Sequence, residues 1–185
     1  PPASGAIQRL AGRSLHQHVH VGQSAGTPVI ALTHPDVHLD LGGIAKGYAV
    51  DRAAAALRAH GVTRALVNVG GDLVAIGTNG DDAPWQVGIR DPEDARRLLM
   101  TVAASDCAIA TSGDYEQFFR YRGHRYHHLM DPRTAAPAAG PLRSATVRAA
   151  RCLDADAGAT AAFNLTPGEA RDALARRGAE LLAIA

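Results

Sequence analysis

The segment Asp40-Leu-Gly-Gly-Ile-Ala-Lys-Gly-Tyr48 carries the chain from an extended run into its longest predicted helix, Ile44–His60. Paired glycines let a ligand approach the backbone closely, and the first turn of a helix offers free N–H groups at the positive end of its dipole. Lys46 falls in that first turn. The segment is neither a Walker-type phosphate loop nor a Gly-x-Gly-x-x-Gly dinucleotide turn. It therefore predicts either an anion site that uses Lys46 or a tight strand-to-helix turn with a solvated lysine.

Composition draws attention to the same lysine. The chain has 185 residues and 19 basic side chains, and all of them except Lys46 are arginines. In a chain with so strong a bias toward arginine, the one remaining lysine indicates a position where arginine does not serve.

Length and charge bound the class of protein. A chain of 185 residues with 46% apolar side chains can bury the core of one globular domain. The formal net charge of +1 argues against a nucleic-acid or membrane surface. No apolar run approaches the roughly 18 residues of a membrane-spanning helix. Two cysteines, Cys107 and Cys152, exclude a disulfide-rich fold.

Hydrophobic periodicity predicts short strands with a few helices among them. The helices are expected over Ala6–Ala11, Ile44–His60 and Asp154–Asn164, the third with Asp154 as N-cap, and over a last helix that a Thr166/Glu169 capping box opens and Gly178 ends. The strands are expected over His16–Val21, Thr27–Leu32, Arg64–Val69, Asp72–Ile76, Trp85–Ile89, Leu98–Ala103, Cys107–Ala110, Gln117–Tyr121, Tyr126–Met130, Ser144–Ala149 and Glu180–Ile184. This order predicts an α+β fold of mostly antiparallel sheets with a few packed helices, as one domain over residues 1–185.

Two further segments combine turns with polar residues. Asn68-Val-Gly-Gly-Asp72 reads as a plain hairpin turn or as a close approach of backbone to a ligand. In Gly123–Thr134, neighbouring side chains of a strand point to opposite faces, so only one of His127 and His128 can face a given site. Such a histidine can act as a general base or contact a phosphate, or the segment is a surface hairpin.

The predicted helix after residue 153 carries a pair of hard oxygen donors. Asp156 and Thr160 are four residues apart, which places a carboxylate and a hydroxyl on one helix face. Mg²⁺ commonly takes few protein oxygens and completes its shell with phosphate and water. The alternative is an ordinary helix whose first turn is acidic.

A separate group of histidines alternates along the first predicted strand. His16, His18 and His20 share a face, with His34 and His38 nearby in the sequence. They read as a metal patch or, more simply, as solvated surface, and the second reading is favoured.

Together these motifs resemble the ApbE family of FAD:protein FMN transferases. They run in the family's order across nearly all of the chain. The matching segments are Asp40–Asp51, Asn68–Asp72, Ala110–Tyr115, Tyr126–Thr134 and Asp154–Ala161. The resemblance implies an ApbE-like, T-fold-like architecture, for which this chain is short at its N-terminal side.

The resemblance also implies a reaction and roles for named residues. FMN passes from FAD to a Thr or Ser hydroxyl of an acceptor flavoprotein in a redox complex, and AMP leaves. The implied Mg²⁺ ligands are the Gly43 carbonyl, Asp156 and Thr160. Asp40, Lys46, His128 and Leu129 would contact FAD. His128 would be the general base, with Asp156 as a rival.

Some features depart from the family's pattern. Ala135 stands where the family usually has glycine, and Gly43 stands where alanine is common. Two other readings remain open: an FAD pyrophosphatase that uses the same site with water as acceptor and gives FMN and AMP, and a shortened, non-catalytic module that binds flavin or metal, which the short N-terminal side favours. The resemblance implies a place outside the cytoplasm, although the Pro1-Pro2-Ala3 start shows neither Met nor a signal pattern and indicates a processed chain or a fragment.

Overall fold

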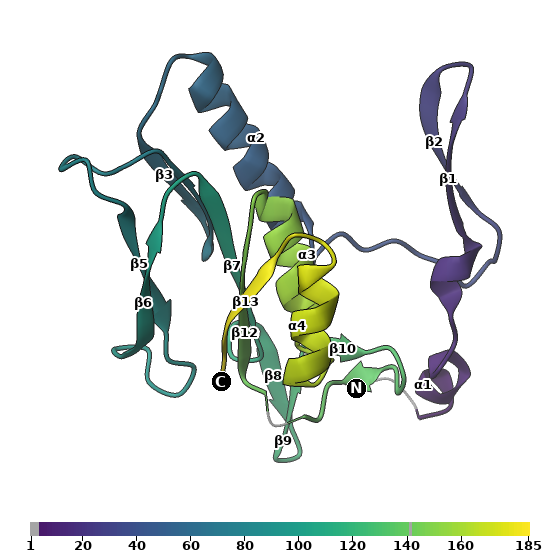
Figure 1. Cartoon of the computed structure of the whole chain (residues 1–185). Helices are drawn as coiled ribbons and strands as arrows, with labels where there is room; N and C mark the ends of the chain where they lie inside the picture. Colours follow the sequence, from purple (N-terminus) through teal and green to yellow (C-terminus); the bar gives the residue numbers. More distant parts are fainter. Residues whose placement is uncertain (1–3, 141) are drawn as a thin grey trace. The chain divides into compact units, whose positions relative to one another are not determined.

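The computed structural model describes residues 4–140 and 142–185, so the Pro1-Pro2-Ala3 start lies outside the described residues. It is an α+β structure with antiparallel sheets, which confirms the predicted class (Figure 1). It separates into two compact units. The expectation of one domain over the whole chain stays a prediction. None of the helices in the described ranges is long and apolar enough to cross a membrane.

The first unit holds the described residues up to Leu41 together with Asp131–Ala136. A salt bridge of 2.7 Å joins Arg13 to Asp36 within it. Two short strands, β10 and β11, pair with each other around the second of these segments. Its elements are α1 (Ser4–Leu10), a 3-10 turn (Leu15–His18), β1 (Val19–Ser24) and β2 (Thr27–Leu32). It also includes Asp131 of β10 (Met130–Asp131) and Ala136 of β11 (Ala136–Pro137), whose other residues are counted with the second unit.

The second unit holds Gly42–Met130 and Pro137–Ala185. Its centre is a five-stranded antiparallel sheet with the order β13-β12-β7-β4-β3, and two separate hairpins, β5–β6 and β8–β9, belong to the same unit. Its strands are β3 (Ala65–Val69), β4 (Asp72–Ile76), β5 (Trp85–Arg90), β6 (Leu98–Ala104), β7 (Cys107–Gly113), β8 (Phe118–Tyr121), β9 (His124–His127), β12 (Ser144–Ala149) and β13 (Glu180–Ile184). Its helices are α2 (Ala45–Ala59), α3 (Cys152–Ala162) and α4 (Pro167–Ala175).

The helices pack on one face of the central sheet and the β5–β6 hairpin packs on the other. The position of a residue along its strand decides which of the two its side chain contacts. On β4, Val74 and Ile76 belong to the cluster formed with the helices, whereas Leu73 and Ala75 belong to a second cluster with the β5–β6 hairpin. Side chains alternate between the faces of a strand, so Asp72 shares the helix face with Val74. All five residues of β4 are buried as a result.

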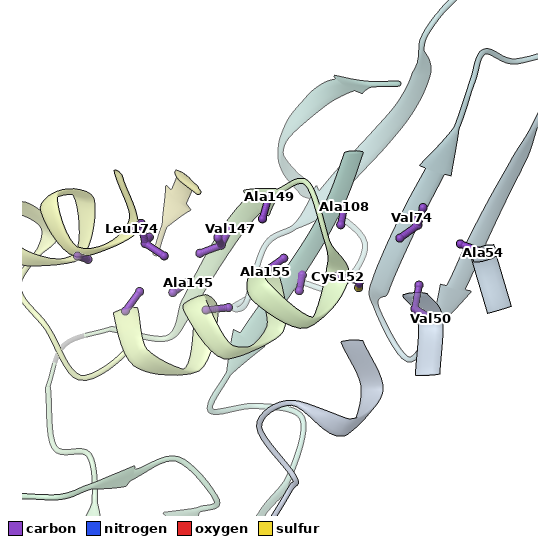
Figure 2. Close-up of a cluster of buried hydrophobic side chains, with 14 of the residues drawn as sticks. Val50, Ala54, Val74, Ala108, Ala145, Val147, Ala149, Cys152, Ala155 and Leu174 are labelled. Carbon is purple, nitrogen blue, oxygen red and sulfur yellow. The ribbon is translucent and has the colours of Figure 1, made fainter. Parts of the chain in front are cut away.

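The helix-side core consists mainly of alanines and valines. Figure 2 shows Ala155 and Cys152 of α3 together with Ala108 and Ala149 of the neighbouring strands. Small side chains allow a helix to lie close to a sheet, and close packing of many small groups supplies the dispersion energy that large side chains would otherwise give. Many of the alanines of the chain thus lie where the helices pack against the sheet.

The helices α2 and α3 cross closely at Gly47. A Cβ atom on Gly47 would lie 2.7 Å from the carbonyl carbon of Cys152 and 2.8 Å from the Cα of Leu153. The Asp51 carboxylate of α2 accepts hydrogen bonds from the amides of Cys152 and Leu153, at 2.8 and 3.0 Å. Asp51 thus satisfies the free N–H groups at the start of α3 from a different helix.

Most predicted elements are confirmed, and a few are wrong for identifiable reasons. Asp154 is not the N-cap of α3: it lies in the first turn, because the helix begins earlier, with Asp51 bonded to its first amides. The first predicted strand starts late, since residues 16–18 form the 3-10 turn. The predicted strand Tyr126–Met130 is split into β9 and β10. The capping box of Thr166 and Glu169 is confirmed.

We predict that Gly47→Ala destabilises the second unit. The new methyl group meets helix backbone that cannot rotate away, so the free energy of unfolding should fall by about 1–3 kcal/mol, against a gain of about 1 kcal/mol in helix propensity. Urea unfolding followed by circular dichroism measures it. Gly168→Ala is the matched control, because Gly168 lies in α4 with nothing near its would-be Cβ. Equal stability of the two variants would show that the crossing is loose.

Candidate functional site

A lysine and two buried carboxylates meet where the start of α2 lies beside β4 and α3. Lys46 Nζ donates to Asp72 Oδ2 at 2.5 Å and lies 3.8 Å from Asp156 Oδ1. Asp72 is 1% exposed and Asp156 is 3% exposed. Two carboxylates against one ammonium leave one formal negative charge in this cluster, in surroundings of low dielectric where charge interactions are strong.

Asp156 is fixed by the backbone of α2. Its Oδ2 accepts a hydrogen bond of 2.9 Å from the Gly47 amide, a group of the first helical turn that has no partner within its own helix. The positive end of the α2 dipole favours a negative charge at that place. The bond needs the close crossing at Gly47, so the same glycine permits the packing and orients the carboxylate.

Asp72 has one oxygen engaged and one oxygen free of protein partners. Its Oδ2 accepts from Lys46, whereas Oδ1 is buried without a hydrogen-bond partner among the described residues. Burial raises the pKa of Asp72 to about 6, and the nearby Asp156 carboxylate acts in the same direction, while Lys46 opposes both. Burial alone would lower the pKa of Lys46, but the hydrogen bond to Asp72 and the charges of both carboxylates outweigh it and raise that pKa.

Thr160 of α3 lies close to Gly43, which precedes α2. Thr160 is one turn after Asp156, and its hydroxyl lies 3.0 Å from the Ser112 hydroxyl of β7. A Cβ atom on Gly43 would lie 3.3 Å from Thr160 Oγ1, which shows how close the backbone comes to this hydroxyl. The fold therefore brings Gly43 close to Thr160, which lies one helical turn after Asp156, and their role as a ligand set stays a prediction.

These residues fit a hard divalent cation. A carboxylate, a hydroxyl and a backbone carbonyl are oxygen donors of the kind that Mg²⁺ takes, and the unpartnered Asp72 Oδ1 adds an acceptor near them. Among the described residues, there is no group of three or more His, Cys, Asp or Glu side chains that could hold a metal ion. The alternating histidines of the first unit thus show no such group, and a cation at Asp156 would depend on mixed oxygen donors.

The two neighbouring histidines behave differently. His127 is buried, with Nε2 at 3.0 Å from the Ala138 carbonyl and Nδ1 accepting from the Leu129 amide at 3.3 Å. These contacts hold a neutral ring, and burial lowers the pKa of His127. His128 is exposed, with Nδ1 at 3.2 Å from the Gln117 carbonyl.

His128 and Leu129 are not joined to the cluster by the contacts of the described residues. Across residues 4–140 and 142–185, no hydrogen bond or ion pair links His128 or the buried Leu129 to Lys46 or Asp156. Asp40 is exposed and belongs to the first unit.

Three residues that hold the site in place have no role predicted from the sequence: Asp51, Asp72 and Ser112. All three stand inside the matching segments, but only strand parity shows that Asp72 and Ser112 face the helices. Asp51 follows Lys46 by five residues, and nothing in that spacing indicates a partner about a hundred residues away.

Comparison with known proteins gives a consistent result. The model of the ApbE family matches residues 1–184. A curated FAD:protein FMN transferase of Treponema pallidum is 41% identical over 158 residues, which are 80% of this chain and 44% of that protein. One from Klebsiella pneumoniae is 34% identical over 96% of this chain and 51% of its own length. The chain thus spans about half the length of these curated relatives.

Solved structures of ApbE proteins also resemble this chain. The crystal structure of the ApbE protein of Thermotoga maritima superposes with a TM-score of 0.88 at 32% identity, and covers 100% of this chain and 62% of that one. The flavin transferase ApbE of Vibrio cholerae gives 0.76 at 31% identity, over 95% and 55% of the two chains.

We predict that Asp72 makes stability depend on pH. Its pKa is near 6 in the folded chain and about 3.9 in an unfolded one, so between pH 4 and 6 the folded chain binds the proton more tightly. The free energy of unfolding should therefore fall as the pH rises from about 4 to 6. In Asp72→Asn this part of the fall should be absent.

Urea unfolding in the presence of a chelator, at half-unit steps of pH, measures the difference between the two chains. Asp82→Asn removes an exposed carboxylate that pairs with Arg64, and it should keep the wild-type slope. Parallel curves for wild type and Asp72→Asn would contradict the assignment.

Proposed function

The chain belongs to the ApbE family, and from that premise we propose that it is the part of an FAD:protein FMN transferase that holds the phosphates and a divalent cation. The observation that supports this most is the cluster of the half-buried Lys46 with the buried Asp72 and Asp156 at the first turn of α2. An ammonium group, a helix N-terminus and oxygen donors for a cation are the groups that a pyrophosphate requires.

The proposed reaction is a phosphoryl transfer. A Thr or Ser hydroxyl of an acceptor flavoprotein in a redox complex attacks the phosphorus on the FMN side of FAD. The bond from that phosphorus to the bridging oxygen breaks, its electron pair leaves with AMP, and the hydroxyl proton passes to a base. The product is a phosphoester between FMN and the acceptor, so no oxidant or reductant is consumed.

The residues divide this work. Bound Mg²⁺, with Asp156, Thr160 and the Gly43 carbonyl as ligands, would supply charge neutralisation at the phosphates. The Gly47 amide keeps the Asp156 carboxylate in place, and Ser112 restrains the Thr160 hydroxyl. Lys46, held by Asp72, supplies a positive charge within the same cluster. Asp156, Thr160 and Lys46 already hold these positions, so the proposed roles require no rearrangement of the sheet or the helices.

The flavin side of the proposal rests on the family resemblance. His128 is the proposed general base for the acceptor hydroxyl, because it is exposed and its ring is not held between two backbone groups as His127 is. Asp156 remains the rival base. Leu129 is proposed to line the flavin pocket and Asp40 to bond the cofactor. By the same resemblance we propose that the protein works outside the cytoplasm.

A transfer assay tests the function. The chain incubated with FAD, Mg²⁺ and a threonine-bearing acceptor domain should yield an acceptor that stays fluorescent after denaturing electrophoresis, with one AMP released per flavin bound. FMN and AMP without labelled acceptor would indicate an FAD pyrophosphatase in its place. Binding of FAD with neither product would indicate a non-catalytic module. Absence of both binding and products would refute the proposal.

We predict that Asp156→Ala abolishes Mg²⁺-dependent binding of FAD. It removes the only charged ligand of the proposed set, and the loss should exceed 10-fold in affinity. Calorimetric titration of FAD with and without Mg²⁺ measures it. Asp154→Ala is the matched control, because Asp154 lies in the same helix but pairs with Arg151. Unchanged binding by Asp156→Ala would make the metal assignment wrong.

A further inference from the structure

Asp72 has no part in the ligand set proposed above, yet it is the most deeply buried carboxylate of the cluster. It is 1% exposed, and it lies at the start of β4 on the face that the helices cover. Desolvating a carboxylate is costly unless its oxygens are paired, and here Oδ1 has no protein partner in the described part of the chain. An unpaired buried oxygen beside a candidate cation site indicates a ligand that is met only when the site is filled.

Lys46 is shared unequally between the two carboxylates. It is hydrogen-bonded to Asp72 at 2.5 Å, and it stands off from Asp156 at 3.8 Å. Asp156 Oδ2 is meanwhile held by the Gly47 amide. The Asp156 Oδ1 oxygen is therefore near the ammonium without being bound tightly by it. If Asp72 lost its charge, Asp156 would be the carboxylate left within reach of the ammonium.

From this geometry, and on the basis of the proposed function, we propose that Asp72 is a positioning residue that keeps Lys46 off Asp156, so that a divalent cation can bind there. Its Oδ1 then serves as an acceptor for the hydration shell of that cation. Mg²⁺ keeps several of its waters in protein sites, and groups that bond such ligands commonly change metal affinity by 10- to 100-fold. In the cation-free chain, Lys46 thus balances one of the two carboxylate charges.

The alternative is that Asp72 only stabilises the fold by pairing with Lys46. The two readings differ in what happens when both members of the pair are removed. A purely structural pair, once lost, should leave cation affinity where it was. A pair that governs access to Asp156 should give weak binding when Asp72 alone is changed and recovery when Lys46 is removed as well.

Calorimetric titration of the full chain with Mn²⁺, without FAD, distinguishes them. Asp72→Asn keeps the shape of the side chain but loses its charge, and we expect Mn²⁺ affinity to fall by about 10- to 100-fold. Adding Lys46→Met removes the competing ammonium and restores the net charge of the cluster, so affinity should return to within about 5-fold of wild type. Asp82→Asn makes the same change of charge at an exposed site and should bind Mn²⁺ as the wild type does.

Each outcome bears on the inference. Wild-type affinity in Asp72→Asn would overturn it, and so would a double variant that binds as weakly as the single one. Unfolding midpoints in chelator show that each variant is folded, and recovery in the double variant shows it independently.

The inference and the proposed function can fail separately. If Asp156→Ala loses Mn²⁺ binding while Asp72→Asn keeps it, only the role of Asp72 is wrong. If Asp156→Ala binds Mn²⁺ as the wild type does, the metal assignment of the proposed function fails and the inference fails with it.

Discussion

The hydrogen bond from the Gly47 amide to Asp156, at 2.9 Å, is one of three that join the two helices on which the candidate site is built, and it is the one that orients the Asp156 carboxylate. It forms because a glycine at that position lets α2 come within van der Waals contact of the α3 backbone. The Asp51 carboxylate, one turn further along α2, secures the start of α3 in the same crossing. A buried carboxylate that meets a helix N-terminus is compensated both by the hydrogen bond and by the dipole. Packing and electrostatics therefore depend on one crossing between two helices that are far apart in the sequence.

The sheet supplies the other half of the site through strand parity. Asp72 of β4 and Ser112 of β7 point to the face that α2 and α3 cover, where they meet Lys46 and Thr160. The hydrophobic residues of the same strands alternate between the helix-side core and the core beneath the β5–β6 hairpin. Because both faces are packed, a shift of either strand by one residue would bury the wrong side chains and remove the polar ones from the helices. The register that builds the core thus also places the polar groups.

Much of this arrangement could be predicted from the sequence, and the failures have a common physical origin. Local signals identified the helix after the paired glycines, the Thr166 capping box and most strands, since they depend on neighbours within a few residues. Helical spacing indicates the Asp156/Thr160 pair, and the fact that Lys46 is the only lysine of the chain indicates that residue. Asp51 as the cap of α3, the Lys46–Asp72 bond and the Ser112–Thr160 contact join residues that are 26 to 102 positions apart, so no local pattern could indicate them. The wrong assignment of Asp154 as an N-cap is the same failure, because the true partner came from another helix.

The central claim is that this crossing builds a cation site from Asp156, Thr160 and the Gly43 carbonyl beside Lys46. The most direct test is a crystal structure of the chain with Mn²⁺, in which the anomalous scattering of manganese locates the ion. The account predicts one strong anomalous peak within about 2.5 Å of an oxygen from each of the three residues, with Lys46 still bonded to Asp72. A manganese-saturated crystal with no peak at Asp156, or with Lys46 seated on Asp156 in its place, would contradict it.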